Sequence, residues 1–153
     1  MTPPFEVRAL RREDLAAWRF LWEGYNAFYG RSGITALPAQ ITQLTWQRFF
    51  DAREPMHALV AECSGTLVGL AHFLFHRSTI QAHPTCYLQD LFTAQSARGQ
   101  GIGRALIEAV YARAQGAGST RVYWQTHETN ALAMRLYDQV AERSGFIVYR
   151  KAL

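Results

Sequence analysis

A set of closely spaced glycines between a strand and a helix constrains this chain more than any other feature. Residues 88–93 have the apolar character of a strand, a short polar loop follows, and Gly99, Gly101 and Gly103 open a long helical pattern. A helix that begins in such a loop presents free backbone N–H groups at the positive end of its dipole. The sequence therefore predicts a site at residues 98–104 that is suited to a phosphate or pyrophosphate.

The rest of the chain is typical of one globular domain, which we expect to span residues 1–153. Nearly half of the residues are hydrophobic and 18% are charged, enough to build a core. No apolar stretch approaches the roughly 20 residues that cross a bilayer, and the first residues lack the pattern of a signal peptide. We therefore expect a cytoplasmic protein that contacts no membrane.

Charge and cysteine usage exclude several classes of function. The net charge of +4 is spread along the chain without a block of basic residues. No basic helix, zinc pattern or aromatic nucleic-acid motif accompanies it, so we expect no nucleic-acid partner. Cys63 and Cys86 have neither metal-ligand spacing nor an evident base nearby in the sequence, which argues against a metal site and against an acyl-cysteine route.

Hydrophobic periodicity and turn residues predict alternating strands and helices. We expect strands at residues 5–10, 57–63, 66–75, 85–93, 121–126 and 145–153. Helices are expected at residues 12–28, between Pro38 and Pro55, and at residues 101–115 and 130–142. This order combines antiparallel hairpins with helical crossovers, and so predicts an α+β (mixed α/β) fold.

Two common nucleotide-binding motifs do not match the glycines. A dinucleotide fingerprint requires G-x-G-x-x-G and an acidic residue about 20 positions later, but Arg104 and Arg121 stand at those places. A phosphate-binding P-loop requires a G-K-[ST] ending, which is absent. Glycines that only turn the chain remain the alternative to an anion site.

Residues 98–103 resemble the Q/R-x-x-G-x-G/A loop of the GCN5-related N-acetyltransferase (GNAT) superfamily, which holds the pyrophosphate of acetyl-coenzyme A (acetyl-CoA). Residues 87–93 resemble the strand that precedes this loop in the family. Asn130 and Tyr137 on one predicted helix, followed by Gly145 and Phe146, resemble its C-terminal motif. Within the superfamily the chain is most similar to polyamine and histone-type amine acetyltransferases. The resemblance implies a mostly antiparallel, twisted central sheet flanked by helices, with strands splayed around the cofactor.

The resemblance also implies an activity and a cofactor site. The activity is acetyl transfer from acetyl-CoA to a primary amine of a polyamine, a small amine or a lysine, by direct attack in a ternary complex. Backbone groups of residues 91–93 would pair with the pantetheine arm, one N–H acting as an oxyanion donor, and the amides of residues 99–104 would hold the pyrophosphate. The implied cofactor-binding residues are Leu91, Phe92, Thr93, Arg98, Gly99, Gln100, Gly101, Ile102, Gly103, Arg104, Asn130, Ala133 and Tyr137.

Tyr137 is predicted to be the general acid toward the CoA sulfur, the alternative being a half-buried tyrosine with a hydrogen-bonded hydroxyl. The general base is less well defined. Gln89 stands where similar polyamine acetyltransferases have Glu, and an amide takes no proton. Asp90, His127, Glu128 or an ordered chain of waters remain, and we favour Asp90 or Glu128.

Strand alternation puts Asp90 on the face opposite Gln89 unless a bulge intervenes, and we expect His72 to be a residue of the hairpin face rather than a base. Gln89 also leaves open a non-catalytic acyl-CoA-binding sensor of the same fold. The C-terminal strand is a candidate contact in a homodimer. Aromatic and acidic residues of the first helices lie where the family binds its acceptor: Trp18, Trp22, Tyr25, Phe28, Tyr29, Glu13, Asp14 and Glu23.

Overall fold

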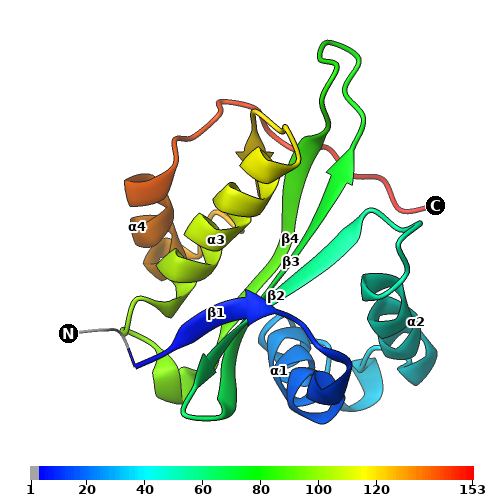
Figure 1. The fold of residues 1–153 in the computed structure, drawn as a ribbon, viewed down its shortest axis with the longest axis vertical. Helices are drawn as coiled ribbons and strands as arrows, with labels where there is room; N and C mark the ends of the chain where they lie inside the picture. The colour runs from blue at the N-terminus through cyan, green and yellow to red at the C-terminus, as the bar shows by residue number, and fades with distance from the viewer. Residues whose placement is uncertain (1–3) are drawn as a thin grey trace.

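The computed structural model describes residues 4–153 as an open five-stranded sheet with helices on both faces (Figure 1). The strands lie in the order β1-β2-β3-β4-β5. Neighbours from β1 to β4 are antiparallel, whereas β4 and β5 are parallel. The predicted mixed α/β fold with a mostly antiparallel sheet is confirmed. The strands are β1 (Glu6–Ala9), β2 (Met56–Cys63), β3 (Thr66–His76), β4 (Thr85–Thr93) and β5 (Val122–Tyr123), and the helices are α1 (Leu15–Phe28), α2 (Ala39–Phe49), α3 (Ile102–Gly116) and α4 (Ala131–Val140).

The hairpin of β2 and β3 forms as the sequence predicts. Its two turn residues, Ser64 and Gly65, both have positive φ, 48° and 81°. Such angles match the twist of the strands on either side of a two-residue turn. Ser64 is the one residue other than glycine with a positive φ in the part of the chain that the structure describes.

Two strand predictions are wrong in extent or existence. Of residues 121–126, only Val122 and Tyr123 pair with β4. Residues 145–153 form no strand and pair with none of the five strands, and β-propensity without a pairing partner does not make a strand. The apolar side chains Phe146, Ile147, Val148 and Tyr149 of this segment are therefore between 64% and 90% exposed. The homodimer contact expected at this segment stays a prediction.

Each face of the sheet carries its own hydrophobic core. One face packs Phe73 and Leu88 against Leu106 of α3, with side chains of α4 at its margin. The opposite face packs Val60 and Leu70 against the aromatic side chains of α1. Figure 1 shows α3 and α4 on one side of the strands and α1 and α2 on the other. None of the helices within residues 4–153 has the length and apolar character that a membrane crossing needs.

Gly69 of β3 lets the start of α3 lie close to the sheet. A Cβ built at Gly69 would lie 3.0 Å from Ile102 Cγ2, 3.1 Å from Leu106 Cδ1 and 3.2 Å from the Phe92 carbonyl oxygen. Ile102 is the first residue of α3 and is buried. The missing side chain of Gly69 therefore helps to place the end of the glycine loop over β4.

Replacing Gly69 by alanine is expected to lower the free energy of unfolding by about 1–3 kcal/mol, because the added methyl group overpacks this contact. Equilibrium unfolding in urea measures the loss. Gly116→Ala is the matched control, since nothing lies within 4 Å of a Cβ there. Equal unfolding midpoints for the two variants would contradict the prediction.

Candidate functional site

A cleft opens where β4 separates from β5. The two strands pair only at Cys86 with Val122 and at Tyr87 with Tyr123. Beyond these pairs the backbone of β4 runs along the cleft with its polar groups turned to the gap. The cleft is lined by Tyr25, Tyr29, Leu88, Gln89, Leu91, Trp124, Gln125 and Tyr137. An extended ligand can therefore lie beside β4 in place of a strand.

A β-bulge in β4 decides which side chains face which layer. His72 of β3 is opposite Asp90, while the next residue, Phe73, is opposite Leu88, so Gln89 is the extra residue. A bulge resets the alternation of the strand. Leu88 therefore packs on the α3 face, whereas Asp90 lies with His72 on the face of α1 and α2. Gln89 is exposed at the cleft.

Asp90 belongs to a buried polar group that the sequence did not reveal. Its Oδ2 lies 2.9 Å from His72 Nδ1, and the other ring nitrogen, Nε2, accepts a hydrogen bond of 2.9 Å from the Trp18 indole. His72 is thus a buried partner of Asp90. The Tyr25 phenol lies at the cleft side of Asp90. Burial, followed by the negative charge of Asp90 and a hydrogen bond with it, raises the pKa of Tyr25.

The other base candidates lie apart from this group. His127 and Glu128 are exposed in the segment between β5 and α4. His127 Nδ1 lies 2.7 Å from the Thr129 hydroxyl oxygen. Neither residue is among those that line the cleft. Of the base candidates from the sequence, only Asp90 is joined to a side chain of the cleft wall.

Tyr137 lies in the cleft, on the face of α4 that meets Trp124. The two rings meet edge to face, with centroids 5.4 Å apart. Its hydroxyl takes part in none of the hydrogen bonds found within residues 4–153, so it is free for a ligand. Burial, with a smaller effect of Tyr29, raises the pKa of Tyr137 to about 12. The phenol is therefore protonated at physiological pH and can donate.

The glycine loop presents a row of backbone donors. Gly99 and Gly101 have φ of 78° and 82°, and the first hydrogen bond at the start of α3 runs from the Ala105 N–H to the Gly101 carbonyl. The N–H groups of residues 99–104 have no backbone acceptor in the described chain. Free donors at a helix N-terminus form an anion site. The loop thus fits a pyrophosphate.

Two arginines frame the loop. Arg98 Nε donates to the Thr93 carbonyl at 3.2 Å, and its guanidinium lies 5.9 Å from the centre of the Phe92 ring. Arg104 donates to Gln139 of α4. These contacts hold the loop between β4 and α4 and keep two positive charges beside its donors.

The first turn of α4 faces the same region. Asn130 stands at the N-cap of α4, but its amide donates to the Thr126 hydroxyl at 3.3 Å instead of capping the helix. Helical spacing puts Asn130, Ala133 and Tyr137 along one side of α4. The loop lies against α4 at Gly103, where an added Cβ would be 3.3 Å from Leu136 Cδ2, and at Arg104, which donates to Gln139.

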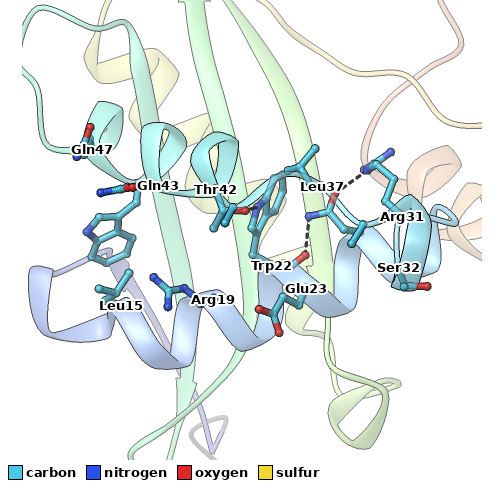
Figure 2. Close-up of a pocket in the computed structure, with 15 residues that line it drawn as sticks. Leu15, Arg19, Trp22, Glu23, Arg31, Ser32, Leu37, Thr42, Gln43 and Gln47 are labelled. Atoms are coloured by element: carbon cyan, nitrogen blue, oxygen red, sulfur yellow. Dashed lines mark hydrogen bonds between the residues drawn. The ribbon is translucent and has the colours of Figure 1, made fainter.

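The residues expected at the acceptor groove lie in different places, and two of them, Glu13 and Phe28, are exposed and do not line the cleft. Trp18 and Trp22 are buried in the core beneath α1, and Asp14 is paired with Arg8, whose guanidinium hydrogen bonds lower the Asp14 pKa. Tyr25 and Tyr29 line the cleft. Glu23 instead lines a separate groove between α1 and α2, shown in Figure 2.

Several known proteins are similar to this chain in sequence or in fold. The model of the acetyltransferase (GNAT) family matches residues 15–141. The D-amino-acid N-acetyltransferase HPA3 of Saccharomyces cerevisiae is 33% identical over 147 residues, which cover 95% of this chain and 89% of that protein. A ribosomal-protein-alanine N-acetyltransferase from Brucella melitensis has a TM-score of 0.75 at 19% identity, covering 97% of this chain and 99% of the other. AAC(6')-Iy in complex with a bisubstrate analogue containing CoA has a TM-score of 0.80 at 18% identity, with coverage of 97% and 99%.

Gly101→Ala is expected to weaken coenzyme A binding roughly tenfold. A side chain at positive φ costs about 1–2 kcal/mol, which the loop would relieve by moving its donors out of place. Isothermal titration calorimetry measures the dissociation constant. Gly65→Ala is the matched control, because Gly65 has nearly the same φ of 81° but lies in the hairpin turn. Unchanged affinity in Gly101→Ala would contradict the assignment of the loop.

Proposed function

Because the chain belongs to the acetyltransferase (GNAT) family, we propose that it acetylates a primary amine by direct attack within a ternary complex. The protein is an acetyl-CoA-dependent N-acetyltransferase, so the acyl-CoA-binding sensor that the sequence left open is set aside. The observation that carries the proposed mechanism is the cleft beside β4. Two phenols line this cleft. The hydroxyl of Tyr137 is free, and Tyr25 lies beside the buried carboxylate of Asp90.

We assign the cofactor to the glycine loop and the open edge of β4. The N–H groups of residues 99–104 would hold the pyrophosphate, and the backbone of Leu91, Phe92 and Thr93 would pair with the pantetheine arm. Asn130 and Ala133 would close the far side. Bound acetyl-CoA supplies the acetyl group already activated as a thioester, so no side chain of the protein has to be acylated.

Asp90 is the proposed acceptor of the amine proton, acting through Tyr25. A primary amine with a pKa of about 10 is mostly protonated at neutral pH and must lose a proton before it attacks. Tyr25 can take this proton at its hydroxyl oxygen while it passes its own proton to Asp90. The raised pKa of Tyr25 keeps the phenol neutral before and after the transfer. Glu128, also favoured from the sequence, is exposed and away from the cleft wall.

Tyr137 is the proposed donor to the leaving sulfur. Its hydroxyl is protonated, unpaired within the described chain and directed to the cleft. A thiolate in this buried cleft is poorly solvated, which raises its basicity and favours proton uptake from the phenol. The proton that leaves Tyr137 ends on the sulfur, and solvent restores it after product release.

Arg31 supports an acceptor that carries a carboxylate. Its guanidinium lies 5.6 Å from the centre of the Tyr29 ring and 5.9 Å from that of Tyr25, two residues of the cleft wall, while Arg31 itself lines the groove between α1 and α2. Arg31 Nε donates to Asn26 Oδ1 at 2.6 Å, and buried Asn26 is itself anchored to the Trp22 carbonyl. Figure 2 shows Arg31 among the side chains that line the groove between α1 and α2.

The free end of Arg31 suits bidentate binding of a carboxylate. None of the ion pairs within residues 4–153 includes Arg31. A cation without an ion-pair partner beside Tyr25 and Tyr29 also repels a polyamine or another polycation. The sequence leaves a polyamine, an amino acid, an antibiotic amine and a protein lysine open as acceptors. Because the relative HPA3 is a D-amino-acid N-acetyltransferase, we propose an amino acid among them.

Tyr137→Phe is expected to lower kcat about 100-fold, the lower range of what a positioned acid contributes. The phenylalanine ring keeps the contact with Trp124, so coenzyme A affinity should stay within about twofold. A free-thiol assay gives kcat, and calorimetry gives the affinity. Tyr111→Phe is the control, because the Tyr111 hydroxyl donates to the Val140 carbonyl outside the cleft. A kcat for Tyr137→Phe equal to that of the control would remove Tyr137 from its assigned role.

Arg31→Gln is expected to raise KM for D-phenylalanine by about 10- to 100-fold, the usual effect of losing a hydrogen bond to a charged group. KM for phenethylamine, which lacks the carboxylate, should be unchanged or lower. Arg19→Gln is the control, since Arg19 lines the same groove as Arg31 but, unlike Arg31, makes no cation–π contact with Tyr25 or Tyr29 in the described chain. An equal increase of KM for both amines would argue against carboxylate recognition.

A further inference from the structure

Three side chains from three elements form a continuous line of hydrogen bonds behind the cleft. The Trp18 indole Nε1 of α1 lies 2.9 Å from His72 Nε2 of β3, and His72 Nδ1 lies 2.9 Å from Asp90 Oδ2 of β4. Trp18 is fully buried, His72 is 3% exposed and Asp90 is 9% exposed. A histidine bonded at both ring nitrogens in the core has a defined proton position.

The Trp18 indole decides which ring nitrogen of His72 carries the proton. An indole N–H is a donor only, so His72 Nε2 must accept. The proton of a neutral imidazole then lies on Nδ1 and is donated to the Asp90 carboxylate. A second proton, on Nε2, would point at the indole N–H and break this hydrogen bond.

The surroundings give no other group that would favour a charged imidazole. The rings of Trp18, Trp22 and Phe49 lie with centroids 5.9, 5.1 and 4.6 Å from that of His72. Asp90 is the charged group that contacts it. Next to Asp90 is Tyr25, and beyond Tyr25 are Tyr29 and Arg31.

We propose that Trp18 fixes His72 in its neutral Nδ1–H form, and that His72 acts as a positioning residue for Asp90. The fixed N–H holds one oxygen of the carboxylate, Oδ2, and leaves Oδ1 without a contact to the imidazole. It also prevents an imidazolium from forming beside Asp90, which would hold the carboxylate in its charged form and weaken it as a proton acceptor. This inference rests on the proposed role of Asp90 as base.

The tautomer can be measured without any substrate. Nitrogen-15 NMR of histidine-labelled protein at about pH 8 is expected to show His72 as the Nδ1–H form. In Trp18→Phe, which keeps an aromatic ring in the core, Nε2 loses its donor, and the Nε2–H form of His72 should appear. An Nε2–H form or an imidazolium in the wild-type protein at this pH would overturn the inference.

Substitution of His72 itself distinguishes a residue that positions Asp90 from one that transfers a proton. The amide of His72→Gln can accept from Trp18 and donate to Asp90 but cannot titrate, so kcat should stay within about threefold of the wild type. His72→Leu can do neither, and kcat should fall roughly 100-fold with little change in the coenzyme A dissociation constant. An equal loss in both variants would mean that His72 carries the proton, and full activity in both would deny it any role.

Asp90→Asn tests the proposed base separately. Activity retained in that variant would show that Asp90 is not the base, whereas the NMR measurement on the wild-type protein reports the His72 tautomer independently.

Discussion

The extra residue in β4 is the constraint on which the cleft depends. Opposite His72 and Phe73, β4 has three residues, Leu88, Gln89 and Asp90, in place of two. The insertion keeps Leu88 in one core and brings Asp90 to the other face of the sheet. It also coincides with the end of the pairing between β4 and β5, which stops at Tyr87. A regular β4 would pair further with β5, close the cleft and leave Asp90 without His72.

Helix α1 supplies the side chains that contact His72 and Asp90. Trp18 and Tyr25 lie two turns apart on one face of this helix, so the first reaches His72 and the second reaches Asp90. The helix can lie this close because it has a glycine at the contact: a Cβ at Gly24 would be 3.1 Å from the Phe92 ring. The polar line behind the cleft is therefore held by packing on both sides.

The cleft keeps neutral donors close to a buried anion. Burial raises the pKa of both Tyr25 and Tyr137, so both phenols stay protonated. Their partners differ: Tyr25 is tied to Asp90, whereas the Tyr137 hydroxyl is free. Two similar side chains thus suit opposite proton transfers, because one faces a carboxylate and the other faces open space.

The sequence by itself determined the features whose physics is local. The fold class followed from the order of periodic segments and the hairpin from Ser64 and Gly65. Motifs within single stretches of chain predict the anion loop and the role of Tyr137, and both stay predictions. The terminal strand at residues 145–153 was predicted wrongly, since apolar alternation reports β-propensity and not whether a sheet edge is available. Only the tertiary structure decided that His72 joins Asp90 and that Glu128 stays outside the cleft. His72 and Asp90 lie 18 residues apart, and Trp18 lies 54 from His72, so their contact depends on strand register and on how a helix packs across the sheet.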